Sequence, residues 1–167
     1  ENEGDLVISL GTSDTMFASL ENPKPSAQQG HIFVNPIIPR AFMAMIARKN
    51  GSFAREMVRN NFTDGKWSEF NSMLEKSPPG NRGNIGMYIL EPEITPPITK
   101  TGIYRFDVKD RAVEVFTPHE NVRAIIEGQF LSLSIHAEKI GIRPLRLIAT
   151  GGASANTSIL KIVANIF

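Results

Sequence analysis

The stretch that most limits how this chain can fold is IATGGASAN, residues 148–156. An apolar run stops at Thr150, two glycines follow, and a helix pattern begins at about Asn156, with Ser154 or Asn156 as its cap. This order predicts a short buried strand that passes through a glycine loop into a helix on an α/β scaffold. Glycines let a ligand approach the main chain, and a helix start offers unpaired N–H groups to a phosphate.

A simpler explanation of this loop stays open, because a strand-to-helix connection can need glycine only for its backbone angles and glycine-rich patterns often mislead. Two familiar phosphate loops are excluded. The stretch does not contain G-x-x-x-x-G-K-[ST], the pattern of the P-loop. It also lacks G-x-G-x-x-G, and no acidic residue follows at the spacing of a dinucleotide site.

The chain opens with a second loop that can face a ligand. Residues 5–20 predict two strands joined by the polar turn LGTSDT. Gly11, Thr12 and Ser13 can aim N–H and hydroxyl groups at a phosphate chain. A plain turn, in which Ser13 and Asp14 make local hydrogen bonds, is the alternative. If the two loops face each other, one can hold the phosphates of a nucleotide and the other its sugar and base.

The region after the opening hairpin predicts strands first and helices later. His31–Val34 and Phe42–Ala47 read as further strands between prolines. Asn50 can cap a helix that places Phe53 on its apolar face, and Trp67–Leu74 predicts a second short helix.

Residues 77–106 are rich in proline and glycine. The stretch EPEITPPITKTG cannot be a central strand, because each proline removes a hydrogen-bond donor. We therefore expect an irregular excursion over about 63–106, either beside a cleft or simply on the surface.

The clearest helix is predicted between Thr117 and Gly141. Thr117 with Glu120 forms a Thr-x-x-Glu capping box, and Gly141 is a natural stop. Gly128 lies inside this helix at a cost of about 1 kcal/mol relative to alanine. A close neighbour packed across it would explain that glycine.

Composition excludes several classes of function. Eighteen basic side chains nearly cancel seventeen acidic ones, so nothing indicates nucleic acid as a partner. The chain has no cysteine, and its three histidines lack a metal-ligand spacing. No apolar run can span a membrane and no secretory signal is visible, which favours a soluble, cytoplasmic protein. The strand and helix patterns run almost to both termini, so we expect a piece of a longer chain, truncated at both ends.

Three stretches, GDLVISLGTSDT, HENVRAIIEGQFLSLSIHAE and LIATGGASANTSILKIVANIF, resemble motifs of one family. They are similar to the second phosphate motif, the C-terminal signature helix and the adenosine motif of the FGGY carbohydrate kinases, within the actin-like ATPase superfamily. The three matches come in the family's order and nearly span the chain. The shorter stretches GTSDT, GHIFVNP, KNGS and EITP are most similar to the xylulose kinases of animals.

This resemblance implies a ribonuclease H-like fold of the actin-like ATPase type, with a β-hairpin opening and flanking helices. Residues 1–167 then form part of a C-terminal nucleotide-binding domain. The implied activity is ATP-dependent phosphorylation of a sugar hydroxyl with Mg²⁺, for D-xylulose the 5-hydroxyl. The residues implied to lie near the β- and γ-phosphates are Gly11, Thr12 and Ser13.

The same resemblance implies an adenosine site in the second half of the chain. The residues implied to approach adenosine and the α-phosphate through their backbone are Gly151, Gly152 and Ala153. Asn156 is implied to contact the nucleotide while capping the last helix. Trp67 is either a flat wall beside adenine or a helix-packing aromatic next to Phe70.

The resemblance also implies that essential parts lie elsewhere. The catalytic aspartate of the family lies just upstream of the GTS motif, so no catalytic residue is expected in this chain. Asp14 matches a turn residue beside the phosphates rather than a base. Asp5, at the start of the first strand, is no better candidate for the base. Sugar contacts belong to the N-terminal half of the same polypeptide. Without that half, we expect little or no activity.

Two other hypotheses stay open at this point. A non-catalytic nucleotide-binding or interaction module of the actin-like type would use the same loops, or would keep only the fold. A different nucleotide-using enzyme would share only the glycine loops. Protection from unfolding by ATP rather than NAD would favour the sugar kinase or the non-catalytic module over a different nucleotide-using enzyme.

Overall fold

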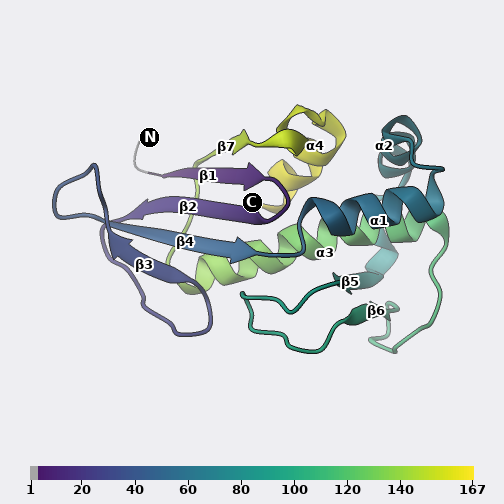
Figure 1. Cartoon of the computed structure of the whole chain (residues 1–167), viewed down its shortest axis with the longest axis horizontal. Coiled ribbons are helices and arrows are strands. Elements are labelled where there is room, and N and C mark those ends of the chain that lie inside the picture. The colour runs from purple at the N-terminus through teal and green to yellow at the C-terminus, as the bar shows by residue number, and fades with distance from the viewer. Residues whose placement is uncertain (1–3) are drawn as a thin grey trace.

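Alternating apolar residues build a five-stranded sheet at the centre of the molecule. The computed structural model describes residues 4–167, and its main sheet has the order β3-β4-β2-β1-β7 (Figure 1). The strands are β1 (Asp5–Leu10), β2 (Asp14–Leu20), β3 (His31–Val34), β4 (Phe42–Arg48) and β7 (Arg146–Thr150). In β2, buried and half-buried residues alternate along the whole strand, as expected when one face of a sheet is covered. The predicted strands are thus confirmed.

The strand β7 differs from the other four in direction and in exposure. It pairs parallel with β1, whereas β1, β2, β4 and β3 are joined in antiparallel pairs. Its residues alternate between exposed and half-buried, because β1 is its only sheet partner among the described residues. The prediction of a buried strand at this position was therefore wrong, although the strand itself is present.

Within residues 4–167, four α-helices accompany the sheet: α1 (Ser52–Phe62), α2 (Trp67–Lys76), α3 (Pro118–Lys139) and α4 (Thr157–Ile166). Helix α3 runs alongside the sheet and continues beside α1 (Figure 1). Its side chains Ile126, Phe130 and Leu133 are fully buried with Ile8 and Ile46 of the sheet. Each such buried side chain stabilises the fold by about 1.5–3 kcal/mol relative to its exposed state.

The predicted details of α3 are confirmed. The Thr117 hydroxyl accepts the Glu120 N–H at 3.3 Å, and the Glu120 carboxylate accepts the Thr117 N–H at 2.8 Å. Gly128 lies against the Gly86 carbonyl oxygen, so a Cβ there would collide with the backbone of β5 (Ile85–Ile89). Gly141 has a φ of +94° just after the helix ends.

The segment around residues 77–106 is more regular than the sequence predicts. It contains a tight turn, η1 (Pro79–Gly83), in which Gly80, Asn81 and Arg82 have positive φ, and an antiparallel pair of strands, β5 and β6 (Gly102–Phe106). This hairpin packs beside α3 rather than extending the main sheet (Figure 1). The prolines that hid it lie in the connection between the strands, where no ladder donor is needed. Helix α2 was predicted correctly.

The start of α1 corrects two predictions. Asn50 does not cap the helix, since Gly51 takes the N-cap position without a side-chain hydrogen bond. The buried Asn50 amide instead accepts the N–H groups of Leu90 and Glu91 at 2.7 and 3.0 Å. Phe53 is 60% exposed and faces away from the core.

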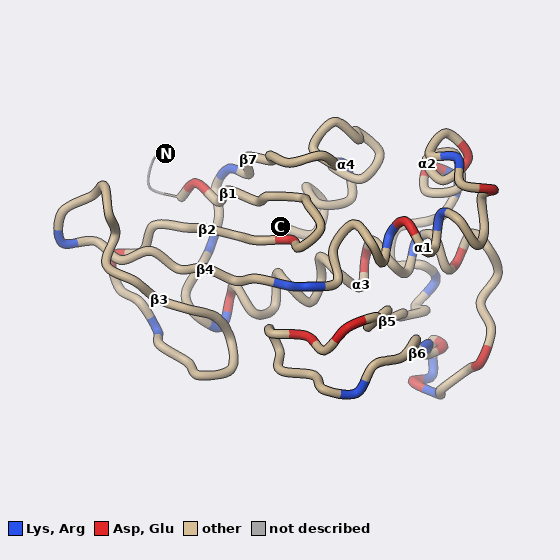
Figure 2. Tube along the Cα trace, in the orientation of Figure 1, with Lys and Arg blue, Asp and Glu red and all other residues tan. Residues whose placement is uncertain are grey.

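Charges of both signs are interspersed along the trace (Figure 2). Within residues 4–167 there is no helix that combines the length and the apolar character needed to cross a membrane.

Candidate functional site

The two glycine loops meet at the carboxyl ends of the parallel strands β1 and β7. Ser9 pairs with Thr150 at this end of the sheet, so the turn after β1 and the bend after β7 emerge side by side. A cavity of about 440 Å³ opens between them and helices α1 and α2. Its lining includes five residues predicted from the sequence, namely Gly11, Gly152, Ala153, Asn156 and Trp67. Ligands of open α/β sheets usually bind at the carboxyl ends of strands.

The turn after β1 presents its N–H groups away from the protein. The carbonyl of Gly11 accepts the Ser52 N–H at 2.9 Å, and the carbonyl of Thr12 accepts the Gly51 N–H at 3.2 Å. In a trans peptide the N–H is antiparallel to the C=O, so the N–H groups of Thr12 and Ser13 point away from α1. Neither donates to another described residue. Both side chains are exposed and lie just outside the cavity lining.

A buried ion pair supports this turn from below. Arg55 of α1 donates to both carboxylate oxygens of Asp14, at 2.6 and 3.0 Å, and both side chains are 1% exposed. The same guanidinium donates to the Gln129 side chain at 2.9 Å and lies 3.5 Å from the Gly11 carbonyl. Burial raises the pKa of Asp14, while the hydrogen bonds and charge of Arg55 oppose that shift. Asp14 thus fixes the turn, and both of its carboxylate oxygens accept hydrogen bonds from Arg55.

A second buried carboxylate fixes the junction between β4 and α1. Glu93 accepts the backbone N–H groups of Lys49, Asn50 and Ile94 at 2.7, 3.2 and 2.9 Å. Burial favours a higher pKa for Glu93, but the Asn50 side chain, these N–H groups and Arg48 together hold its pKa below the ordinary value. The loop before β6 is thereby attached to the residues that lead into the site.

The two glycines after β7 have different surroundings. Gly151 has a φ of +84°, and a Cβ there would lie 2.7 Å from the Leu10 carbonyl oxygen, so this position packs directly on β1. Around Gly152 a Cβ would meet no heavy atom within 4 Å. Ser154 donates to the Gly151 carbonyl at 2.6 Å and holds the bend, so it is not the cap of α4. Gly152 is therefore the glycine that faces open space.

Asn156 caps α4, as predicted. Its side-chain oxygen accepts the N–H groups of Ser158 and Ile159 at 3.1 and 3.2 Å. Its amide nitrogen donates to the Asn71 oxygen of α2 at 2.8 Å. Both ends of this amide have protein partners, and Asn71, which also lines the cavity, keeps its own amide nitrogen available.

Trp67 packs against a helix aromatic and also lines the cavity, while its contact with adenine stays a prediction. It packs edge-on against Phe70, with ring centroids 5.1 Å apart, and it also lines the cavity. The Arg59 guanidinium lies 4.7 Å from the centre of the indole ring. These contacts fix the indole in place, which suits a flat wall for a planar ligand.

The sequence analysis missed several residues that line the cavity: Ser52, Arg55, Glu56 and Asn71. The only feature of the sequence that could have indicated these residues is their spacing along predicted helices. Ser52 and Glu56 are four residues apart on α1, and Asn71 follows Trp67 by four residues on α2, so each pair shares one helix face.

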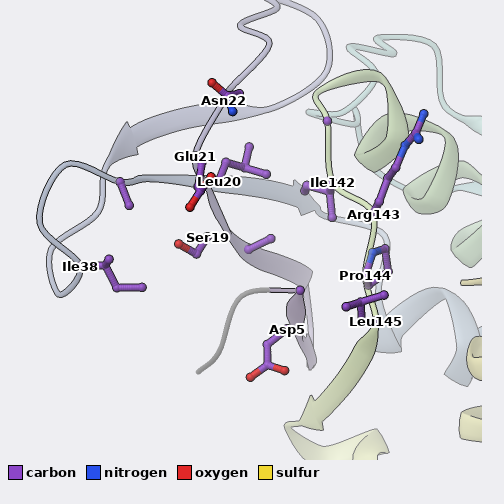
Figure 3. A pocket seen from close by; sticks show the side chains of 14 residues that line it. Asp5, Ser19, Leu20, Glu21, Asn22, Ile38, Ile142, Arg143, Pro144 and Leu145 are labelled. Carbon is purple, nitrogen blue, oxygen red and sulfur yellow. The ribbon is translucent and has the colours of Figure 1, made fainter.

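A larger hollow of about 780 Å³ lies at the opposite, amino ends of β1 and β7 (Figure 3). Its lining includes Ser19, Ile142 and Leu145, and none of the predicted site residues. Asp5, which with Glu21 is one of two carboxylates in its lining, is bound by Arg146 at 2.7 and 2.8 Å. Size alone favours this hollow, but the two glycine loops converge on the smaller cavity, which we therefore assign as the candidate site.

Comparison with known proteins agrees with this fold. The chain is 44% identical to the xylulose kinase of Mus musculus over 168 residues, and 44% identical to xylulose kinase 2 of Arabidopsis thaliana over 177 residues. These alignments cover 99% and 98% of the chain but only 30% and 31% of the relatives, so the chain spans about a third of their length.

The crystal structure of xylulose kinase from Rhodospirillum rubrum superimposes with a TM-score of 0.78 at 14% identity, over 98% of this chain and 33% of that one. This likeness confirms the predicted fold. The model of the C-terminal domain of FGGY carbohydrate kinases matches residues 6–167, almost the whole chain. The chain therefore belongs to the FGGY family of carbohydrate kinases, of which it represents the C-terminal domain.

Proposed function

We propose that this chain is the ATP-binding part of a sugar kinase that transfers the γ-phosphoryl group of ATP to D-xylulose, giving D-xylulose 5-phosphate. The observation that carries the proposal is the convergence of Gly11 and Gly152 on one cavity at the carboxyl ends of β1 and β7. Relatives 44% identical to this chain are named xylulose kinases, which supports D-xylulose as the substrate.

The geometry suggests how the chain binds the nucleotide. The N–H groups and hydroxyls of Thr12 and Ser13 make no hydrogen bond to any described residue, so they can donate to phosphate oxygens. The first turn of α1 lies directly behind this turn and adds the positive end of its dipole. The base then lies beside Trp67, and the open face at Gly152 admits the nucleoside close to the main chain.

The remaining parts of the reaction lie outside this chain in our proposal. Asp14 is buried against Arg55, so we assign the base that activates the sugar hydroxyl to the N-terminal half of the full-length protein. The sugar site is assigned there too. Closure of the two halves would exclude water while the phosphoryl group is transferred. The cytoplasmic location expected from the sequence belongs to this proposal as well.

Mg²⁺ fits the proposal only as a companion of the nucleotide. Within the part of the chain that the structure describes, no three or more His, Cys, Asp or Glu side chains are grouped to hold a metal ion. Mg²⁺ is commonly bound by one or two carboxylates together with substrate phosphates. When bound, the ion would neutralise developing charge on the phosphates.

A kinase assay of the full-length protein tests this proposal. ATP is supplied with D-xylulose, ribulose, glycerol or gluconate, and ADP release is measured. We expect the highest kcat/KM with D-xylulose. A protein that binds ATP and phosphorylates none of the four sugars would instead be a non-catalytic nucleotide-binding module.

A further inference from the structure

Glu56 is the one acidic side chain in the lining of the candidate site. It is half-buried on the cavity face of α1, and it has no ion pair or hydrogen bond with any described residue. The other buried carboxylates near the site, Asp14 and Glu93, are occupied by Arg55 and by backbone N–H groups. Glu56 therefore offers acceptor oxygens to whatever enters the cavity.

The positions along α1 place Glu56 in the middle of the site. Ser52, Glu56 and Arg59 follow the i, i+4, i+7 spacing of one helix face. Ser52 lies at the phosphate turn, because its N–H binds the Gly11 carbonyl. Arg59 lies at the aromatic wall, because its guanidinium covers Trp67. Glu56 is therefore about 6 Å along the axis from the phosphate end.

The chemistry of a carboxylate narrows what Glu56 can bind. An ionised carboxylate only accepts hydrogen bonds, so among the groups of a nucleotide its hydrogen-bond partner must be a donor. Phosphate oxygens carry negative charge and would be repelled. In a nucleotide the ribose hydroxyls lie between the phosphates and the base, which matches the place of Glu56 between Ser52 and Trp67.

We propose that Glu56 binds the 2′- and 3′-hydroxyl groups of the ribose and so selects ribonucleotides over deoxyribonucleotides. This inference rests on the proposed function, because it requires a nucleotide in this cavity with its phosphates at Gly11. The ribose then binds to α1, and the base binds beside Trp67 and Asn71 of α2.

Calorimetric titration of the full-length protein with ADP, 2′-deoxyADP and 3′-deoxyADP tests the inference. A hydrogen bond to a charged group contributes about 1.5–3 kcal/mol, so we expect the unmodified protein to bind ADP at least about tenfold more tightly than either deoxynucleotide. In Glu56→Ala, ADP binding should weaken by a similar factor and the three affinities should become nearly equal. Glu138→Gln, which removes an exposed carboxylate of α3, should keep the original preference.

Each other outcome is decisive. Equal binding of the three nucleotides by the unmodified protein, or an undiminished preference for ADP in Glu56→Ala, contradicts the role of Glu56 while leaving nucleotide binding intact. Failure of the unmodified protein to bind ADP at all contradicts the proposed function, and the inference with it.

Discussion

The two ends of the β1–β7 pair differ in what they offer a ligand. The hollow at the amino ends measures about 780 Å³ and the cavity at the carboxyl ends about 440 Å³. The larger one is walled by Ile142, Pro144 and Leu145 (Figure 3), and of its two carboxylates, Asp5 and Glu21, the first is bound by Arg146. The smaller one has an open glycine and a fixed indole, and the turn that carries the unbonded Thr12 and Ser13 N–H groups lies at its edge. In our proposal the convergence of the two glycine loops, rather than volume, marks the functional end.

The two ends also differ in how they are supported. At the carboxyl end, Arg55 and Asp14 are both buried, and Gln129 joins them to the start of α1 by donating to the Asn50 and Gly51 carbonyls at 2.6 and 3.2 Å. At the amino end, the Arg146 side chain is 58% exposed. A site that must hold a charged ligand in one geometry needs rigid support, which the carboxyl end provides.

Breaking the ion pair at each end should give the largest contrast. Arg55→Ala leaves the Asp14 carboxylate buried without its main partner, so we expect the free energy of unfolding to fall by about 3–5 kcal/mol. Arg146→Ala removes a guanidinium that is 58% exposed, although its partner Asp5 is only 3% exposed, so we expect a smaller loss of about 1–3 kcal/mol. Urea denaturation measures both. Equal losses would show that the support of the two ends is alike.

Filling each cavity should sharpen the contrast in binding. Gly152→Val places a side chain in open space without a clash in the protein, so the variant should fold but obstruct the nucleoside. Overpacking costs about 1–3 kcal/mol, which corresponds to about a ten- to hundredfold loss of ADP affinity. Glu21→Trp, which fills the larger hollow, should leave ADP affinity unchanged. Unchanged ADP affinity in Gly152→Val together with weakened affinity in Glu21→Trp would show that the nucleotide binds at the amino ends of β1 and β7.

Removing one hydroxyl of the phosphate turn should have a smaller and more selective effect. Thr12→Ala in the full-length protein removes a donor to the phosphates, so we expect kcat to fall by about tenfold or more while sugar binding changes little. Thr12→Ser restores the hydroxyl and should recover most of the activity. Unchanged turnover in Thr12→Ala would remove this residue from the mechanism.

The smallest expected effect is on the pH dependence of folding stability, through Glu93 near the carboxyl ends of β1 and β7. The folded-state pKa of Glu93 is held below its ordinary 4.5, so its carboxylate stabilises the fold above about pH 4.5. That contribution is lost as the pH falls through the lower, folded-state pKa. Glu93→Gln should be less stable at pH 7 and should lose less stability on acidification to pH 3.

Chemical denaturation at several pH values checks this dependence. Glu138→Gln, which alters an exposed carboxyl on α3, serves as the control and should follow the unmodified protein. An acid response of Glu93→Gln identical to that of the unmodified protein would contradict the role assigned to Glu93.

Local patterns in the sequence predicted much of this architecture. The alternation in β1 and β2, the capping box at Thr117 and the glycine loops each depend on residues close together in the chain. The sequence also predicted Gly152 and Trp67, which the structure brings into one cavity. Whether they contact adenosine stays a prediction.

The parts that were missed depend on contacts between distant residues. Arg55 meets Asp14 from 41 positions away and Gln129 from 74 positions away, and no local pattern reveals such partners. Asn50 looked like a helix cap, but its amide is used by a loop about 40 residues later. The β5–β6 hairpin was hidden by the prolines between its strands.

A crystal structure of the full-length protein with ADP tests the central claim most directly. The account predicts one ADP in the cavity at the carboxyl ends of β1 and β7, with its phosphates at Gly11 and Thr12 and its base beside Trp67. An ADP molecule in the hollow beside Ile142 and Leu145, or with its phosphates at Trp67, would contradict it.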